Sequence, residues 1–95
     1  MIEIKLVSYV DSFAENKDLA KDIRLNQIIP SLDKKEEVVL DFEGIDSTTQ
    51  SFIHALLSDL FRRYGADVLD NICFKNCNEI VQKIINIVIS YMQEV

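Results

Sequence analysis

The spacing of the apolar residues switches repeatedly between two periods, and this alternation restricts the fold more than any other feature of the chain. Every second residue from Ile2 to Leu6 is apolar, which predicts a β-strand over residues 2–8. The apolar run within residues 37–42 is nearly continuous, as is typical of a strand covered on both faces. A further apolar segment predicts a strand over residues 68–74. The sequence therefore predicts three strands.

Between and after these strands, apolar residues recur every three or four positions, which is the spacing of an amphipathic helix. The first predicted helix spans residues 17–32. Pro30 leaves an alternative, in which this helix ends near Ile28 and residues 29–32 form a separate turn. The second predicted helix spans residues 49–64.

The last predicted helix follows the third strand and has a wide apolar face. Asn76 or Asn78 is expected to cap its start, and Glu79 lies in its first turn. The apolar residues of this face are Ile80, Val81, Ile84, Ile85, Val88, Ile89 and Met92. We expect the whole face to belong to the core; the alternative is that an exposed remainder marks a surface for a partner.

The predicted order of elements is β-α-β-α-β-α, with residues 9–16 left open between a loop and a hairpin partner of the first strand. This alternation predicts an α/β fold, in which a small single-layer mixed sheet packs with helices and contains at least one parallel pair. The chain has 95 residues, which is typical of one domain. Residues 1–95 are therefore predicted to form a single domain.

The charge and hydropathy of the chain disfavour two classes of partner. The net charge is −6, whereas binding to nucleic acid depends on clustered Lys and Arg. No apolar run approaches the ~20 residues that a membrane-spanning helix needs, and the first residues do not resemble a signal peptide. We expect a cytoplasmic protein that binds neither nucleic acid nor membrane.

The cysteines and the histidine do not predict a metal site. Cys73 and Cys77 are expected to be reduced, as is usual for a protein inside the cell. Together with His54 they would still lack a fourth zinc ligand, and their spacing is not typical of zinc sites. We expect neither a metal nor another cofactor.

The sequence also gives little indication of a catalytic site. The sequence contains no glycine-rich phosphate loop, no nucleophile elbow and no HExxH motif. A hydrolase or transferase using Asp41, Asp46 and Ser51 is the least favoured hypothesis, because no set of nucleophile, base and oxyanion donors is visible. We expect a protein without enzymatic activity.

The polar stretch DFEGIDSTTQSF, residues 41–52, connects the central strand to the second helix. Its hydroxyl residues are all suitable helix caps, although one cap is enough. The stretch lies at the carboxyl end of a strand and the start of a helix, where α/β proteins bind ligands and anions. The surplus of polar residues therefore suggests a displayed recognition loop.

Two segments resemble a known family. VVLDFEGIDSTTQSFIHALLSDLFRRYG and ICFKNCNEIVQKIINIVISYM are similar to the STAS-like family of small bacterial and phage-borne domains, over roughly residues 36–93. The positions that match the family pattern are Asp41, Phe42, Gly44, Ile45, Ser51, Phe52 and Asn76. The resemblance implies a STAS-like fold and a role in bacterial signalling.

The STAS-like family is similar in turn to the STAS domains of anti-sigma factor antagonists, which are non-enzymatic binding modules. Their counterpart loop contains an Asp-Ser pair, and the serine is phosphorylated by a partner ATPase of the histidine-kinase-like fold. When this pair is aligned through Asp41 and Gly44, it falls at Thr49 and Gln50. Gln50 cannot be phosphorylated. Ser51 or Thr49 could therefore be the phosphorylated residue only if the alignment is shifted.

Three functional hypotheses follow. The first is a regulatory module that binds a protein partner, such as a histidine-kinase-like ATPase or a transcription regulator, through the 44–52 loop and the following helix. The second is a signalling domain switched by phosphorylation at Ser51 or Thr49, and the third is a structural subunit that homodimerises through the last helix. The predicted binding residues are Asp41, Gly44, Asp46, Ser47, Thr48, Thr49, Gln50, Ser51 and Phe52.

Overall fold

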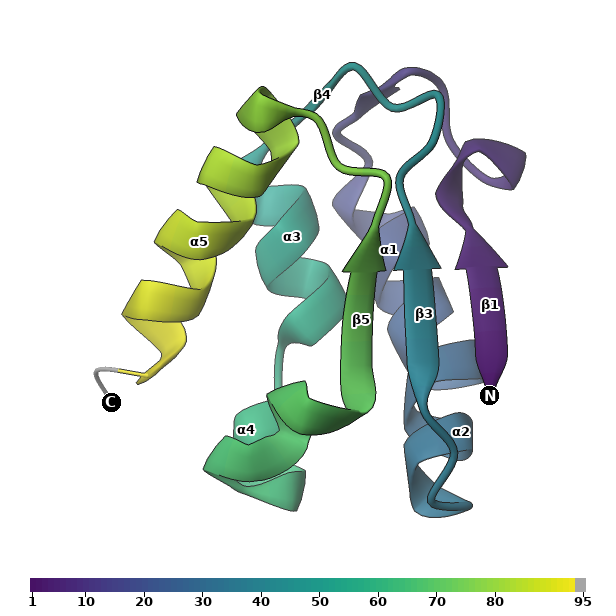
Figure 1. Cartoon of the computed structure of the whole chain (residues 1–95), viewed down its shortest axis with the longest axis vertical. Coiled ribbons are helices and arrows are strands. Elements are labelled where there is room, and N and C mark those ends of the chain that lie inside the picture. Colours follow the sequence, from purple (N-terminus) through teal and green to yellow (C-terminus); the bar gives the residue numbers. More distant parts are fainter. Residues whose placement is uncertain (94–95) are drawn as a thin grey trace.

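Three parallel strands form the main sheet of the computed structural model, which describes residues 1–93. The strands β1 (Ile2–Lys5), β3 (Val38–Asp41) and β5 (Ile72–Lys75) are ordered β1-β3-β5 (Figure 1). Both neighbouring pairs are parallel, so the α/β class is confirmed, whereas the expected mixture of strand directions is wrong. Parallel pairing follows from the helical segments that separate consecutive strands along the chain and return it to the same end of the sheet.

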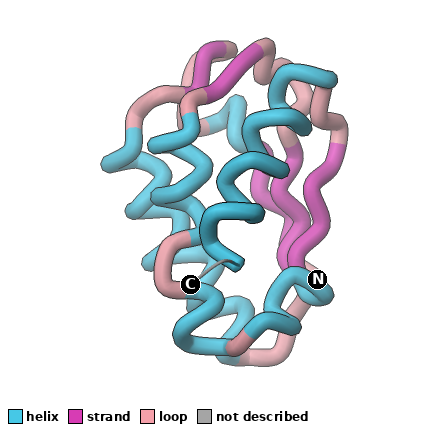
Figure 2. The backbone as a smooth tube through the Cα atoms, turned by 90° about the vertical axis from the view of Figure 1, so that its left-hand side faces the viewer, coloured by secondary structure: helices cyan, strands magenta, loops and turns pink. Residues whose placement is uncertain are grey.

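The helices lie on one face of this sheet (Figures 1 and 2). The register places Ile4, Leu40 and Phe74 side by side on the helix-covered face. The opposite face carries Val39 and Cys73 beside charged residues. On this face Lys75 Nζ lies 3.6 Å from Glu3 Oε2, which joins the two edge strands across the central one. All four residues of β3 are buried, as the apolar run predicted, but helices cover only one of its faces.

The first helical stretch continues from residue 17 to residue 33 in three parts. These are α1 (Lys17–Ile23), a π-helical segment (Arg24–Ile28) and α2 (Ile29–Asp33). Pro30 lies in the first turn of α2. The chain is already helical before Pro30, because the N–H of Ile29 bonds to the carbonyl of Arg24 in the preceding π-helical turn. Pro30 therefore lies inside a continuous helical stretch, where it removes one backbone donor. The alternative, in which the helix ends near Ile28 and residues 29–32 form a separate turn, is wrong, because helical residues continue to Asp33.

The second helical stretch is broken, whereas a single helix over residues 49–64 was expected. The chain forms α3 (Gln50–Leu57) and α4 (Leu60–Tyr64), with Asp59 between them at a φ of 67°. Arg24 Nη1 donates a hydrogen bond of 2.8 Å to the carbonyl of Ala55, which lies in the last turn of α3. A buried guanidinium thus satisfies a carbonyl that a continuing helix would have used.

The predicted outer strands are shorter than expected. The first ends at Lys5 and passes into a 3₁₀ turn, Leu6–Ser8. The third begins only at Ile72, because Ala66–Asn71 also form a 3₁₀ helix. Each of these 3₁₀ segments has one buried residue, Leu6 or Val68, which is too few to show a helical period, so the pattern did not separate them from the strands.

Two short strands form a second sheet above the carboxyl ends of the main strands (Figure 1). β2 (Phe13–Ala14) pairs in parallel with β4 (Ser47–Thr48). Residues 9–16 are therefore partly extended, but they do not form a hairpin with the first strand, because their partner is the distant β4.

The last helix, α5 (Glu79–Gln93), packs against α3 and β4. Val81, Ile85 and Val88 are buried, whereas Ile80 and Tyr91 remain 57% and 64% exposed. The expectation that the whole apolar face belongs to the core is wrong, because α3 and β4 cover only one side of the helix. Within residues 1–93, none of the helices combines the length and the apolar character needed to cross a membrane.

Candidate interaction site around the β3–α3 connection

Asp41 anchors the start of the β3–α3 connection. Its Oδ1 accepts a hydrogen bond of 3.0 Å from Asn76 Nδ2 and one of 2.9 Å from the backbone N–H of Glu43. These two bonds, and the nearby ammonium groups of Lys75 and Lys5, hold the pKa of the Asp41 carboxyl below its ordinary value. Asp41 is thus a charged tie between the ends of β3 and β5.

Asn78 makes a second link, between the β3–α3 connection and the start of α5. Its Oδ1 accepts a hydrogen bond of 2.9 Å from the N–H of Val81, so it caps α5. Its Nδ2 donates a hydrogen bond of 2.8 Å to the carbonyl of Asp46. Asn78 is therefore the cap that the sequence left open between two asparagines, while Asn76 occupies the left-handed region at a φ of 59°.

The middle of the connection is held by β2 and by a close approach to Val7. The N–H of Asp46 donates to the carbonyl of Ser12 at 2.7 Å, and Thr48 Oγ1 donates to the carbonyl of Ala14 at 2.8 Å. Gly44 has a φ of 85°, and a Cβ there would lie 3.3 Å from Val7 Cγ2. The glycine therefore permits both the turn and the contact.

Thr49 ends the connection as the N-cap of α3. Its Oγ1 accepts a hydrogen bond of 3.0 Å from the N–H of Phe52, and its side chain is half-buried. Phe52 itself is fully buried in the core. Both residues therefore serve the fold at this position.

The structure divides the predicted binding residues into three groups. Asp41, Thr48 and Phe52 are buried, and Ser47 and Thr49 are half-buried. The exposed members are Gly44, Asp46, Gln50 and Ser51. The side chains of Thr48 and Thr49 are used in internal hydrogen bonds, and the surface that the segment can offer a partner is narrower than the sequence suggested.

Ser51 and Gln50 line a hollow of about 450 Å³ between α3, α5 and the start of α1. Lys17, His54 and Tyr91 line the same hollow. His54 is an exposed helix residue, as its position in the sequence indicated. The sequence did not associate Lys17 or Tyr91 with this site, because their proximity depends on how α1 and α5 pack beside α3.

An exposed apolar stripe on α5 continues this surface. It consists of Ile80, Ile84, Ile87 and Tyr91, spaced by three or four residues and so aligned along one side of the helix. Ile84 and Ile87 are half-buried, while the two end members are mostly exposed. Of these four residues, Ile80 and Ile84 belong to the apolar face predicted from the sequence, whereas Ile87 and Tyr91 were not included in it. We call these four residues the α5 stripe.

Neither cysteine forms a disulfide. Cys73 is exposed, and Cys77 is half-buried. Burial, with the nearby Asp41 carboxylate and Cys73, raises the pKa of the Cys77 thiol to about 11. In residues 1–93, no three side chains of His, Cys, Asp or Glu come together as metal ligands would.

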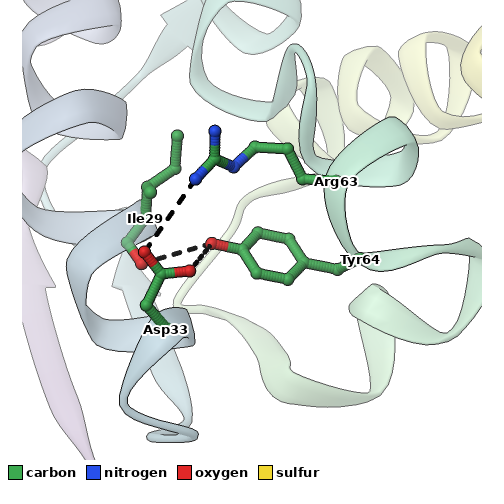
Figure 3. Close-up of polar contacts among 4 residues, drawn as sticks. All are labelled: Ile29, Asp33, Arg63 and Tyr64. Atoms are coloured by element: carbon green, nitrogen blue, oxygen red, sulfur yellow. Dashed lines mark hydrogen bonds and ion pairs between the residues drawn. The ribbon is translucent and has the colours of Figure 1, made fainter.

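A separate polar cluster joins α2 to α4 at the other end of the molecule (Figures 1 and 3). Tyr64 Oη donates a hydrogen bond of 2.6 Å to Asp33 Oδ1 and lies 3.3 Å from the carbonyl of Ile29. Arg63 Nη2 lies 3.9 Å from Asp33 Oδ2. Burial and the bond to Asp33 raise the pKa of the Tyr64 hydroxyl, so it remains a donor and the cluster serves as a structural tie.

Comparison with known proteins places the chain in a family. A family model described as a STAS-like domain of unknown function matches residues 20–82, from within α1 to within α5. Neither a curated protein nor a solved structure matches the chain. The match covers more than half of the chain and includes the whole β3–α3 connection, so the chain belongs to this family of STAS-like domains.

Proposed function

We propose that the chain is a regulatory module without catalytic activity, which binds a protein partner through the first turn of α3 and the α5 stripe. One observation carries the proposal: both ends of the α5 stripe are mostly exposed, and one of them, Tyr91, lines a hollow with the exposed polar residues Gln50 and Ser51. Apolar surface bordered by polar residues is typical of protein interaction sites.

The hydrogen bonds of the β3–α3 connection support this proposal. Asp41, Asn78 and Thr48 fix the connection to β5, α5 and β2, so α3 begins at a defined position. A rigid surface loses little conformational entropy when it binds a partner. The internal bonds thus contribute to recognition indirectly, by holding Gln50 and Ser51 in place.

The absence of catalysis is part of the proposal. The Asp41 carboxylate is engaged by an amide and a backbone N–H, and Ser51 lines a hollow to which neither Asp41 nor Asp46 contributes. These placements do not favour an acid–base or nucleophilic role for the three residues. The family resemblance suggests a cytoplasmic partner, either a histidine-kinase-like ATPase or a transcription regulator.

Site-specific cross-linking tests the proposed surface. A photo-reactive residue at Tyr91 is expected to cross-link a partner in cells, and the complex should then form from the two purified proteins. The matched control is a photo-reactive residue at Leu25, which is also exposed but lies on the first helical stretch. Equal cross-linking from both positions would contradict the proposed surface.

A phosphorylation switch at Ser51 is the second candidate. Ser51 is exposed in the first turn of α3, and Lys17 lines both of the hollows that Ser51 borders. A phosphate there would gain from the helix dipole and from the ammonium group. Thr49 is less suitable, because its hydroxyl caps α3. Intact-mass spectrometry after incubation with the partner ATPase and ATP should show one phosphate, which Ser51→Ala removes.

Homodimerisation through the α5 stripe is the remaining alternative, because the stripe is apolar enough to pair with a second copy. Light scattering distinguishes it from the main proposal. A dimer that Ile84→Glu dissociates would favour a structural subunit, whereas a monomer would leave the α5 stripe free for a different protein.

A further inference from the structure

Two adjoining hollows form a groove along the proposed surface. The first is the hollow of about 450 Å³ beside Ser51, and the second, of about 490 Å³, lies beside the break between α3 and α4. His54 and Tyr91 line both, so the two hollows lie next to each other. We call this feature the α3–α5 groove. It follows α3, whose eight residues rise about 12 Å, or about two helical turns.

The lining of the groove combines apolar contact with positive charge. Leu57 and Val88 are buried beneath it, and Met92 is half-buried. Its basic side chains are Lys17 and Arg62, with the imidazole of His54 between them in the lining.

Among residues 1–93, Asp59 is the one acid that lines the two hollows. Asp59 Oδ1 lies 3.0 Å from Arg62 Nη2, so these two charges offset each other in part, and the described lining has one net positive charge with His54 neutral. The chain as a whole has a net charge of −6, with 16 acidic and 10 basic residues. A groove whose charged lining is mainly basic therefore differs in sign from the molecule that carries it.

We infer that the α3–α5 groove receives an acidic amphipathic helix of the partner protein. The inference rests on the proposed function and names the chemistry of the segment bound. The apolar side of such a helix would cover Leu57, Val88 and Tyr91, while its carboxylates would reach Lys17 and Arg62. Attraction between these carboxylates and the basic residues at both ends of the groove would fix the position of the helix and speed its association.

A second copy of the chain is a poorer match for this groove. The described part of α5 contains one acid, Glu79, and one base, Lys83, so the helix that would enter has no acidic character. The second copy would also bring its own net charge of −6 toward a molecule of the same sign. Charge complementarity therefore favours a different protein.

Two synthetic peptides test the inference. Each has about 18 residues, which is long enough to form a helix, and both share one stripe of leucines. One carries glutamates at the remaining positions, and the other carries lysines. The glutamate peptide is expected to bind the whole chain at least about tenfold more tightly at low ionic strength, and to lose affinity as salt is added. It should shift the backbone amides of His54, Leu57 and Tyr91.

Charge reversal provides the matched variants. Lys17→Glu combined with Arg62→Glu should invert the preference between the two peptides. Lys34→Glu, at the end of α2, should leave it unchanged. Equal or tighter binding of the lysine peptide to the unaltered chain would overturn the inference.

The outcomes separate this inference from the proposed function. If both peptides shift the groove amides with equal affinity, the groove binds apolar helices regardless of charge, and the inference fails while the proposed function stands. If neither peptide shifts them, the inference also fails, and the cross-linking from Tyr91 decides the proposed function on its own.

Discussion

Asp41 illustrates how a single side chain connects the central strand to the recognition surface. Its carboxylate joins β3 to Asn76 beyond β5, and Asn78 then holds the carbonyl of Asp46 from the start of α5. The position of the first turn of α3 therefore depends on two asparagines that lie more than twenty residues after it in the sequence.

The tie between Asp41 and Asn76 predicts a dependence of stability on pH. Because the folded state lowers the pKa of Asp41 below 3.8, the tie stabilises the fold above that pH, and this contribution is lost as the pH falls through the lowered value. Asn76→Gly removes the amide but tolerates the positive φ. Its free energy of unfolding should fall below that of the unaltered protein near neutral pH.

Chemical denaturation at a series of pH values measures this difference. The difference between Asn76→Gly and the unaltered protein should be largest at neutral pH and should shrink below pH 3.8. A difference that stays constant across the whole range would mean that the amide does not interact with the charged carboxylate.

The two thiols are expected to react at different rates. Cys73 is exposed, whereas burial raises the pKa of Cys77 to about 11, so roughly one Cys77 thiol in a thousand is ionised at pH 8. Titration with a disulfide reagent should show one fast and one slow thiol. Cys73→Ser should remove the fast phase and Cys77→Ser the slow one; the reverse assignment would contradict the placement of both residues.

At the scale of elements, the α/β class and the approximate positions of the three main strands could be predicted from hydrophobic spacing. The break between α3 and α4 could not, because Leu56, Leu57 and Leu60 are all buried and the apolar spacing continues through it. The Arg24 side chain, 31 residues before Ala55 in the sequence, donates a hydrogen bond to its carbonyl at the end of α3. A contact between distant residues leaves no local pattern.

The same limit applies to the polar connection before α3. Its composition indicated a helix cap, and Thr49 provides one. The sequence could not show that Thr48 and Asp46 are bonded to β2 and its neighbour Ser12, because the pairing of two-residue strands has no hydrophobic signal. For this reason the segment looked more available to a partner than it is.

Replacing Arg24 should test its role at the end of α3. Arg24→Met keeps the apolar stem but leaves the carbonyl of Ala55 without its donor, which costs about 1–3 kcal/mol. Removing Nε, a buried nitrogen without a partner within residues 1–93, recovers part of this loss. We expect a net destabilisation of about 1–2 kcal/mol in urea unfolding.

Arg62→Met is the matched control for this prediction. Arg62 pairs with Asp59 three residues earlier, but its side chain is 79% exposed, and such pairs contribute about 0.2–0.5 kcal/mol. If the two variants lost equal stability, the buried guanidinium would not be supporting the end of α3.

At the scale of the whole molecule, the contacts that stabilise the fold and the proposed interaction surface lie on different parts of the protein. Helices cover one face of the main sheet, and the Tyr64–Asp33 cluster ties α2 to α4 at the end opposite the β3–α3 connection (Figures 1 and 3). The α5 stripe lies beside the buried row of the same helix, so one element contributes both to the core and to the proposed surface. This arrangement allows surface and core to be altered separately.

Substitutions in the α5 stripe should therefore affect stability much less than substitutions among the buried residues of the same helix. Ile80→Ser and Tyr91→Ser remove exposed apolar groups and should change the free energy of unfolding by less than about 0.5 kcal/mol each. Ile85→Ala leaves a cavity in the core, and we expect it to cost about 2–4 kcal/mol. Urea unfolding measures all three variants. Since substitutions in the α5 stripe should weaken partner binding without unfolding the protein, a loss of stability comparable to that of Ile85→Ala would instead make the stripe part of the core.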